Sequence, residues 1–509
     1  MDRAYMRCGD ADRLRAAGRL SAKIFALALL VAISAASRAD YECALDPSGV
    51  AVSRAESGSR QPDITIYREE QLTHTQAEGR ELLAELISID TTHGNGDNTR
   101  AAEAMAARFR AAGFAEEDLF LFEPAARKGN LVVRYRGENP ACKPLLLLAH
   151  LDVVEANPAL WDTDPFNFVE KDGYFYGRGV SDMKDEAAIH IANLLRLRRE
   201  GFTPRRDIVL ALTADEEGGT HNGVQLLLQE HPDLLDAAFG LNEGGGGVLV
   251  DGEHFAQEVQ LAEKLYLTLD LTMSSKGGHS SMPSKENALF IAGQVLRALQ
   301  SLEFPPALNE VTRGFFEQSL AVTQGELRWA IAGVLQVPPD PSAVALMASY
   351  PFYNASLRTT CAPTIISGGT AENALPQRVK IMVNCRLVPT DSRSQVVAAI
   401  ADAVGQGVEI DWRPKSELSV PVSMQSTVLA TIELVSRNVW PEVPTAPMMS
   451  PGGTDSRFLR AAGVPMYGVN GIFIDVEDDR GHARNERIRT QSFFEGLEFL
   501  YRLTKALAQ

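Results

Sequence analysis

Cysteine is scarce in this sequence, and the cysteines present lack the spacing of a thiolate metal site. There are five in 509 residues, and no two of them form a CxxC pair. Cys8 lies in the basic N-terminal segment, and Cys43, Cys142, Cys361 and Cys385 follow it. Those four permit three disulfide pairings, and the sequence neither chooses among them nor requires any pairing. A metal site built from thiolates is therefore not expected.

Long apolar runs are also missing. The run IFALALLVAIS at 24–34 falls well short of the ~20 residues that a membrane-spanning helix needs. It follows a basic segment and precedes small residues that end at Ala39, which is typical of a secretory signal peptide over 1–39. We expect cleavage near Ala36 or Ala39, an extended leader over 40–74, and a secreted or periplasmic protein without a stable membrane span. An uncleaved membrane anchor is the alternative interpretation.

Positive charge is in deficit, and phosphate-binding motifs are missing. The chain has 49 Lys and Arg against 66 Asp and Glu, which gives a net charge of −17 at pH 7. Such an acidic protein is not expected to bind nucleic acid, whereas some of its acidic groups could hold cations. The glycine run at 244–247 has neither the Lys-Ser/Thr pair of a P-loop nor GxGxxG spacing, so it predicts a turn rather than a nucleotide site.

Helical and strand patterns alternate along the chain from about residue 75. Apolar residues at helical spacing predict helices near Leu82 and Met105, and the runs NLVVRYRG and PLLLLAH predict strands. After Asp182 the pattern is helical up to Gly201, and the run DIVLALT then predicts another strand. This order is typical of a layered α/β domain.

The pattern changes at about residue 258. The segment KLYLTLDLTMSS alternates with period two, as a half-exposed strand does. We expect an inserted α+β domain over 258–418, which includes a less regular stretch rich in Pro and aromatic residues at 303–355. Alternation of helix and strand returns after it. The catalytic domain is therefore expected in two parts, over 75–257 and 419–509.

Polar residues cluster where the predicted buried strands end. An ionisable group there must be paired, hydrogen-bonded or bound to a metal, because an isolated buried charge costs several kcal/mol. The carboxyl ends of strands are also where open α/β sheets build their sites. The residues concerned are His150, Asp182, Glu216, Glu217 and Glu243, to which His482 is added from a loop near the C-terminus.

The set has the composition of a two-metal centre. Two imidazoles and three carboxylates are enough for two divalent ions, provided that one carboxylate bridges them. Oxygen and nitrogen ligands suit Zn²⁺, with Co²⁺ or Mn²⁺ as substitutes. Such ions would activate a shared water, Glu216 would act as its general base, and Asp152 would hold the second N–H of the His150 imidazole. Considered singly, His482 is an ordinary loop histidine and His190 a structural one, so the assignment depends on the whole set.

A series of motifs over residues 75–509 occurs in the order found in a known enzyme family. They are HLDVV, a W...PF spacer, DGYFYGRGVSDMKD, DEEGG, KGGHSS, GGT.EN.LP, SPGGTDSR and H..NE. In these motifs the chain resembles the di-zinc aminoacylase, carboxypeptidase S and glutamate carboxypeptidase metallopeptidase family. The stretch 303–355 and SPGGTDSR look most like its carboxypeptidase S and N-fatty-acyl-amino-acid hydrolase branch. Asp185 and Glu155 depart from the family pattern, and neither is expected to be a ligand.

The resemblance implies a zinc-exopeptidase-like catalytic domain with a mostly parallel central sheet and an inserted lid that usually dimerises. It implies that His279 reaches into the partner subunit's site to stabilise the oxyanion. It also implies that Asn373 and Arg386 bind the substrate carboxylate or the tetrahedral intermediate, and that Gly453 marks the substrate-binding turn. The zinc ligands and the general base that it implies are those that the chemistry had selected, with His150, Asp182, Glu217, Glu243 and His482 as ligands and Glu216 as base. The resemblance adds that Asp182 is the bridging ligand.

The leading hypothesis is a di-zinc hydrolase that cleaves the amide bond next to a free carboxylate, as a carboxypeptidase or dipeptidase. An N-acyl-amino-acid amidohydrolase of the aminoacylase type is the alternative, since it shares the mechanism and differs only in the acyl group. A non-catalytic binding module on the same fold is a hypothesis of another class, which the loss of Glu216 or of a ligand would favour. The expected partners are a small peptide or N-acyl amino acid and a second copy of the chain, bound through the lid.

Overall fold

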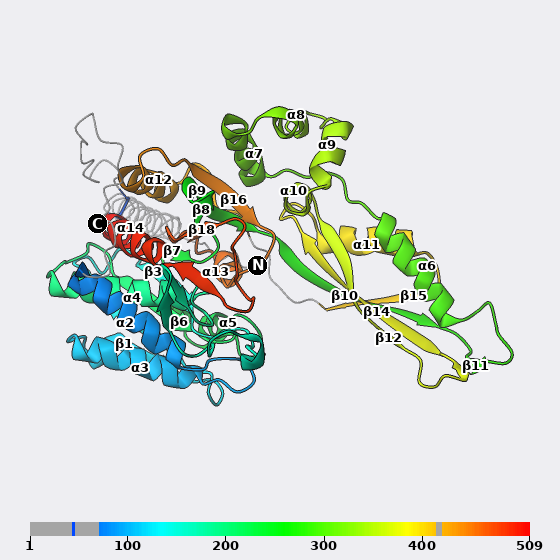
Figure 1. Cartoon of the computed structure of the whole chain (residues 1–509), viewed down its shortest axis with the longest axis horizontal. Helices are drawn as coiled ribbons and strands as arrows, with labels where there is room; N and C mark the ends of the chain where they lie inside the picture. Colours follow the sequence, from blue (N-terminus) through cyan, green and yellow to red (C-terminus); the bar gives the residue numbers. More distant parts are fainter. Residues whose placement is uncertain (1–42, 46–70, 414–419) are drawn as a thin grey trace, which may run out of the picture.

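Residues 43–45, 71–413 and 420–509 are described by the computed structural model of the chain. The expected signal peptide over 1–39 and most of the expected leader lie outside these ranges. Figure 1 shows an α/β domain and a smaller sheet with two helices that projects from it. Within the described ranges, no helix combines the length and the apolar character needed to cross a membrane.

The α/β domain is built on a sheet of ten strands. Across the sheet they run β1 (Leu119–Phe122), β2 (Asn130–Tyr135), β6 (Ile208–Thr213), β3 (Leu145–His150), β7 (Phe239–Asn242), β17 (Met466–Gly468), β9 (Glu253–Glu263), β8 (Gly247–Val250) and β18 (Phe473–Asp475), with β16 (Thr445–Ser450) beside β9. The central strands β6, β3, β7 and β17 are parallel neighbours, which confirms the predicted fold class. Every residue of β3 and β6 is buried, because helices cover both faces, and both strands are accordingly almost wholly apolar.

Two groups of helices provide that cover. α2 (His74–Ser88), α3 (Asn98–Ala111), α4 (Lys184–Arg199), α12 (Thr427–Val439) and α14 (Thr490–Ala508) share the core on one face. α5 (Gly223–Glu230) and α13 (Ser456–Ala461) share the core on the other, where Leu146 and Val209 point. The remaining elements are the 3₁₀ turns η3 (Glu116–Asp118), η4 (Pro158–Leu160) and η5 (Pro232–Leu234), and a small sheet of β4 (Val169–Lys171), β5 (Tyr174–Tyr176) and β19 (Arg487–Arg489).

The projecting body is a four-stranded antiparallel sheet with two helices. Its strands run β12 (Thr360–Gly368), β14 (Arg378–Leu387), β10 (Leu265–Ser274) and β15 (Val408–Arg413), and α6 (Ala288–Ser301) and α11 (Arg393–Val404) pack against them. A ribbon of β11 (Gly278–His279) and β13 (Ala374–Leu375) lies at its tip (Figure 1). β9 still pairs with the central sheet, so the chain passes into this second sheet at Lys264, later than the sequence-based boundary at 258.

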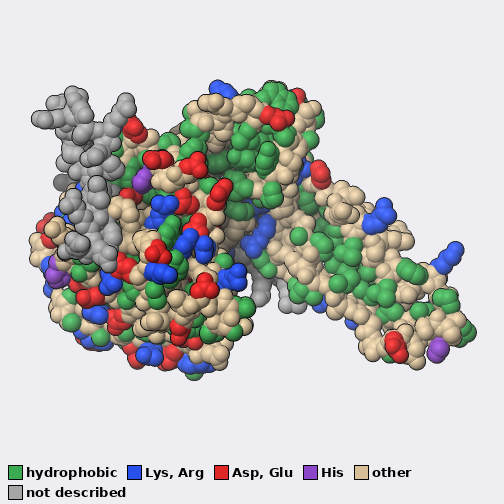
Figure 2. All heavy atoms as spheres, in the orientation of Figure 1, with side chains coloured by type: hydrophobic (Ala, Val, Ile, Leu, Met, Phe, Trp, Pro, Cys, Tyr) green, Lys and Arg blue, Asp and Glu red, His purple; other side chains and the backbone are tan. Residues whose placement is uncertain are grey.

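Residues 303–355, for which the sequence predicted a less regular stretch, are largely helical. They contain α7 (Glu310–Val322), α8 (Gly325–Val334), α9 (Pro341–Ala348) and most of α10 (Pro351–Leu357), and we call 310–357 the helical segment. The prediction was wrong because these helices are short and begin at local signals such as the Asn309 cap of α7 and the Asp340 cap of α9. They enclose a small core around Phe316, and α7 packs along β16. Figure 2 shows hydrophobic side chains on the surface of this segment.

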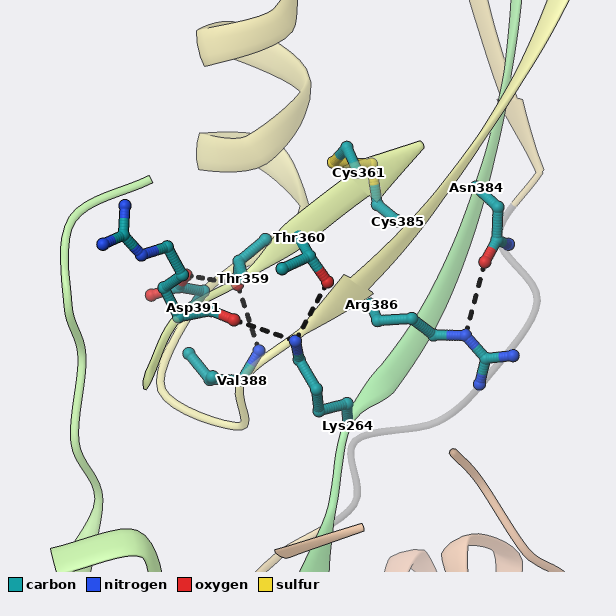
Figure 3. The surroundings of a disulfide bond; sticks show 10 residues. Lys264, Thr359, Thr360, Cys361, Asn384, Cys385, Arg386, Val388 and Asp391 are labelled. Atoms are coloured by element: carbon teal, nitrogen blue, oxygen red, sulfur yellow. Dashed lines mark hydrogen bonds between the residues drawn. A yellow bond between two sulfur atoms is a disulfide. The ribbon is translucent and has the colours of Figure 1, made fainter. Parts of the chain in front are cut away.

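Two disulfides join four cysteines and so settle which of the three pairings forms. Cys43 pairs with Cys142, 99 positions later, and ties the start of the described chain to the loop before β3. Cys361 pairs with Cys385 across the neighbouring strands β12 and β14, close to where the chain enters the second sheet (Figure 3). At that entry the buried Lys264 hydrogen-bonds to the start of β12, so this junction is joined both covalently and by hydrogen bonds.

Candidate metal centre

The five predicted ligands lie at the carboxyl edge of the central sheet, at the end of a strand or in the loops that follow. His150 is the last residue of β3, Glu217 follows β6 and Glu243 follows β7. Asp182 lies just before α4, and His482 lies in the loop between β18 and β19. Because β3, β6 and β7 are parallel, their carboxyl ends meet at one edge of the sheet, and these side chains converge there.

The donor atoms form two groups that share one carboxylate. His150, Asp182 and Glu243 place one donor atom each within 4.8 Å of one another, and so do Asp182, Glu217 and His482. Asp182 Oδ1 lies 3.1 Å from His150 Nε2, and Asp182 Oδ2 lies 3.0 Å from His482 Nε2. Each group offers one imidazole nitrogen and two carboxylates, which are ligands that zinc takes in hydrolases. The residues present therefore fit a pair of divalent ions bridged by Asp182.

Burial and the closeness of opposite charges shift the pKa values of His150, His482 and Glu243. Hydrogen bonds to Asp182 and Glu217 raise the pKa of His482 to about 10. Burial lowers the pKa of His150, but its contacts with Asp182 and Glu243 outweigh burial and raise this pKa well above the ordinary value. Burial raises the pKa of Glu243 to about 7. Protons on the imidazoles thus balance the carboxylates, and divalent cations at the same donor atoms would replace those protons.

Asp152 contacts the site differently from what the sequence led us to expect. His150 Nδ1 lies 2.9 Å from the backbone carbonyl oxygen of Asp152 and 3.7 Å from its carboxylate Oδ1. The buried carboxylate instead accepts the backbone N–H groups of Glu216 and Glu217, at 3.1 and 2.9 Å. The imidazole is therefore oriented by the main chain of residue 152, while the Asp152 side chain positions the two glutamates.

Of the three consecutive acidic residues that follow β6, only Glu216 is left for proton transfer. Glu217 belongs to one of the donor groups, and the Asp215 carboxylate lies 2.5 Å from the Lys128 ammonium. Burial and the nearby Glu243 raise the pKa of Glu216 well above its ordinary value. A carboxyl group of raised pKa that interacts with Glu243 and His150 has the surroundings and the proton affinity that a general base needs.

A buried ion pair holds together the loops of two predicted ligands, Asp182 and His482. Arg178 Nη1 lies 2.5 Å from Glu486 Oε2, and both side chains are almost fully buried. The other oxygen of Glu486 accepts the backbone N–H of Ser181, next to Asp182. Arg178 in turn donates to the backbone carbonyl of His482 at 3.3 Å. The sequence pointed to Glu486 only as the last residue of the motif H..NE, which begins at His482. Arg178 lies in the stretch GRGVSD, and this stretch was the signal from which its role could have been found.

Two guanidinium groups flank the predicted substrate-binding turn. A Cβ atom built on Gly453 would lie 3.2 Å from Arg457 Nη1 and 4.0 Å from Arg386 Nη1. Arg386 comes from β14 of the inserted domain, where its Nε donates to Asn384 Oδ1 at 3.3 Å (Figure 3), and Arg457 comes from α13. Arg457 was missed in the sequence, although it ends the motif SPGGTDSR. Side chains of the two domains thus meet at this turn, and their guanidinium groups are suited to binding a carboxylate.

His279 and Asn373 are not brought to the metal centre of their own chain. Both belong to the exposed ribbon at the tip of the inserted domain, where the backbone N–H of Ser280 donates to the Asn373 carbonyl oxygen. Figure 1 shows this tip, labelled β11, far from β3, β6 and β7. His190 is buried within α4 and belongs to neither donor group, as a structural histidine would be.

Comparison with known proteins places the chain among metallohydrolases. The family model described as Peptidase family M20/M25/M40 matches residues 146–506. The N-fatty-acyl-amino acid synthase/hydrolase PM20D1 of Xenopus tropicalis is 32% identical over 376 residues, which cover 70% of this chain and 71% of that protein. Carboxypeptidase S of Saccharomyces cerevisiae is 26% identical over 420 residues, which cover 73% of each chain.

Solved structures share the fold. The M20 family metallo-carboxypeptidase Sso-CP2 from Sulfolobus solfataricus aligns with a TM-score of 0.66 at 17% identity, covering 85% of this chain and 99% of that one. Human carnosine dipeptidase 1 aligns with a TM-score of 0.58 at 16% identity, covering 85% and 96%. The structural likeness shows the fold, and the family model and the curated relatives show the family. The chain belongs to peptidase family M20/M25/M40 and is a hydrolase of the metallopeptidase and amidohydrolase type.

Proposed function

We propose that this hydrolase carries two zinc ions and cleaves an amide bond next to a free carboxylate. The observation that carries the proposal is the Asp182 carboxylate, whose two oxygens each lie close to an imidazole nitrogen. Glu216 interacts electrostatically with Glu243 and His150 and lies outside both donor groups. The guanidinium groups of Arg386 and Arg457 supply the positive charge that a free carboxylate requires.

Each group has a distinct part in the proposed reaction. Zinc ions held by the two donor groups would polarise the scissile carbonyl and activate water. Glu216 would accept the proton released during attack and pass it to the leaving nitrogen, which must be protonated before it departs. Arg386 and Arg457 would hold the free carboxylate and so place the adjacent amide bond, which favours chain ends over internal bonds.

Two kinds of acyl group are compatible with this chemistry. The sequence placed a peptide first, as for a carboxypeptidase or dipeptidase, and an N-acyl group second. The relatives named N-fatty-acyl-amino acid synthase/hydrolase are 32% (Xenopus tropicalis), 31% (Homo sapiens) and 29% (Mus musculus) identical to the chain, against 26% for carboxypeptidase S. We therefore infer that N-acyl amino acids are the better substrates.

A paired substrate panel tests the proposed reaction. Zinc-loaded mature protein is assayed on dipeptides and on N-acetyl and long-chain N-acyl amino acids, each also as its C-terminal amide. We expect the free acids to be hydrolysed roughly 10- to 100-fold faster than the amides, because the arginines lose a charged partner. Chelation should abolish turnover, and Zn²⁺, Co²⁺ or Mn²⁺ should restore it. Full zinc content without turnover of any substrate would contradict the proposal and favour a binding module.

We also propose that the active form is a dimer joined through the inserted domain. β12 is an edge strand of that domain, and its side chains Ile365 and Ile366 are 56% and 54% exposed. Exposed apolar edge strands pair with other chains. His279 and Asn373 lie far from the metal centre of their own chain. In a dimer, they could contribute to the metal centre of the second copy.

Mixing two inactive variants tests the dimer. His279→Ala and Glu216→Ala chains, each inactive alone, should regain about a quarter of wild-type activity after co-refolding, since a mixed dimer has one site with both residues intact. Separately purified homodimers that are mixed without exchange serve as the control. Mixed dimers, verified by two affinity tags, that show no activity would overturn the shared site.

Export from the cytoplasm is a further part of the proposal. The signal-peptide pattern over 1–39 supports it. The pairs Cys43–Cys142 and Cys361–Cys385 support it independently, because disulfides persist in oxidising compartments.

A further inference from the structure

A cavity of about 620 Å³ lies where the helical segment meets the α/β domain. Its walls come from α7 and α10 on one side and from β8, β9, α12 and the start of β16 on the other. Phe255, Phe315, Val322 and Phe352 make much of the wall apolar. Figure 2 shows hydrophobic side chains of the helical segment facing acidic side chains of the α/β domain at this junction. Cavities of this size hold small molecules of mostly apolar surface.

The cavity is separate from the metal centre. Thr445, the first residue of β16, lines the cavity, whereas Ser450, the last, leads into the turn at Gly453. A strand rises about 3.3 Å per residue, so roughly 16 Å separate the two ends of β16. None of the five predicted ligands, nor Glu216, lines the cavity. An occupant would therefore not compete directly with a substrate at the metal centre.

Among the described residues, one carboxylate in the cavity wall has no charge partner. Glu258 lines the cavity from β9, and burial raises its pKa to about 7. In the described part of the chain, no hydrogen-bond donor or cation is paired with its carboxylate. Its neighbour in register on β16 is Ala446, whose small side chain leaves Glu258 accessible from the cavity. An unpaired carboxylate against apolar walls is costly, which makes it a site for a cation.

The other polar groups of the wall leave the cavity acidic. Glu433 and Arg437 stand four residues apart on α12, where their opposite charges balance. Glu442 adds another carboxylate, and Tyr353 contributes a hydroxyl group of raised pKa from α10. The charged groups of the wall therefore number three carboxylates against one guanidinium.

We propose that this cavity binds a cationic amphiphile, a molecule with a long apolar body and a single amine head that pairs with Glu258. The aromatic and aliphatic side chains of the wall would pack against the apolar body, and the acidic side chains would attract the amine. A fatty acid of the same length is disfavoured because its carboxylate would meet Glu258. A polyamine is disfavoured because it cannot cover the apolar walls. The occupant touches both the helical segment and the α/β domain, so binding stabilises their association.

Calorimetric titration of the zinc-loaded full-length protein with dodecylamine, below its micelle concentration, tests the proposal. We expect one saturable site per chain, an increase in unfolding temperature, and no comparable binding of dodecanoate or dodecanol. Affinity should rise about tenfold between pH 6 and pH 8, because the Glu258 carboxyl, whose pKa is about 7, ionises over that range while the amine stays charged.

Three variants locate the site. Glu258→Gln keeps the shape of the side chain and should weaken dodecylamine binding at least tenfold and remove its pH dependence. Ala446→Phe should fill the cavity beside Glu258 and abolish binding. Glu253→Gln, an exposed residue on the same strand, should change nothing. Unfolding temperatures of the free variants show that each is folded.

Two results would overturn the proposal. Equal binding of dodecylamine and dodecanol would remove the role of the charge. Dodecylamine binding that survives both Glu258→Gln and Ala446→Phe in folded protein would place the amphiphile elsewhere. Hydrolase activity is measured on the same protein. A protein that binds dodecylamine but hydrolyses no substrate would contradict the proposed reaction and leave the proposed cavity ligand standing.

Discussion

Replacement of Glu216 by Gln is expected to lower kcat by about 10² to 10⁴. The amide has the shape of the carboxylate but cannot accept the proton of the attacking water or deliver it to the leaving nitrogen. Asp215 cannot substitute, because its carboxylate is paired with Lys128. KM should change little, since Glu216 lies outside both donor groups and is not one of the two arginines at the substrate turn.

Steady-state kinetics on the best substrate of the panel, together with zinc analysis, check this prediction. Zinc content should remain at two ions per chain, which separates loss of the base from loss of the metal. Glu230→Gln, an exposed residue at the end of α5, is the control and should keep full activity. A kcat within tenfold of wild type at full zinc content would remove Glu216 from its assigned role.

Replacement of Glu486 by Gln is expected to destabilise the fold by about 3 to 5 kcal/mol. Arg178 is 3% exposed, and the substitution leaves its guanidinium buried without a negative partner. The backbone N–H of Ser181 and that of Gly179 also lose a charged acceptor. Because this pair connects the loops of Asp182 and His482, zinc affinity should fall by roughly 10- to 100-fold as well.

Urea denaturation followed by circular dichroism measures the loss of stability, and competition with a zinc indicator measures the affinity. The matched control is Glu116→Gln, which removes an ion pair with Arg110 on the surface and should leave the urea midpoint unchanged. An unchanged midpoint for Glu486→Gln would show that Arg178 finds water or another acceptor when the pair is broken.

Sequence patterns identified the buried strands and the polar residues at their ends well. Within PLLLLAH, the residues LLLLAH are wholly buried as β3, and DIVLALT provides β6, because a parallel strand covered on both faces must be continuously apolar. The same logic picked out His150, Glu217 and Glu243 as out of place in an apolar setting. The helical segment was missed because four short helices, each with a narrow apolar stripe, produce no sustained period.

The role of each polar residue was less accessible to the sequence. The sequence predicted that the Asp152 side chain holds His150, whereas in the folded chain its backbone carbonyl contacts the imidazole and its carboxylate accepts the N–H groups of Glu216 and Glu217. A contact through the side chain of Asp152 and a contact through its backbone carbonyl are both compatible with the two-residue spacing from His150. A motif therefore indicates which residues meet, whereas the atom that makes each contact depends on backbone direction.

The sequence by itself predicted the α/β class, the interruption by a second sheet, and the residue types of the candidate metal centre. Each of these predictions rests on local periodicity or on the residues at the end of a single strand. Tertiary structure alone decided the pairing of the four cysteines, the approach of Arg386 and Arg457 at Gly453, and the cavity at Glu258. The physical reason is distance along the chain. Arg386 and Arg457 belong to separate domains, and the walls at Glu258 span residues 248–446, so these features form only when independently stable elements pack.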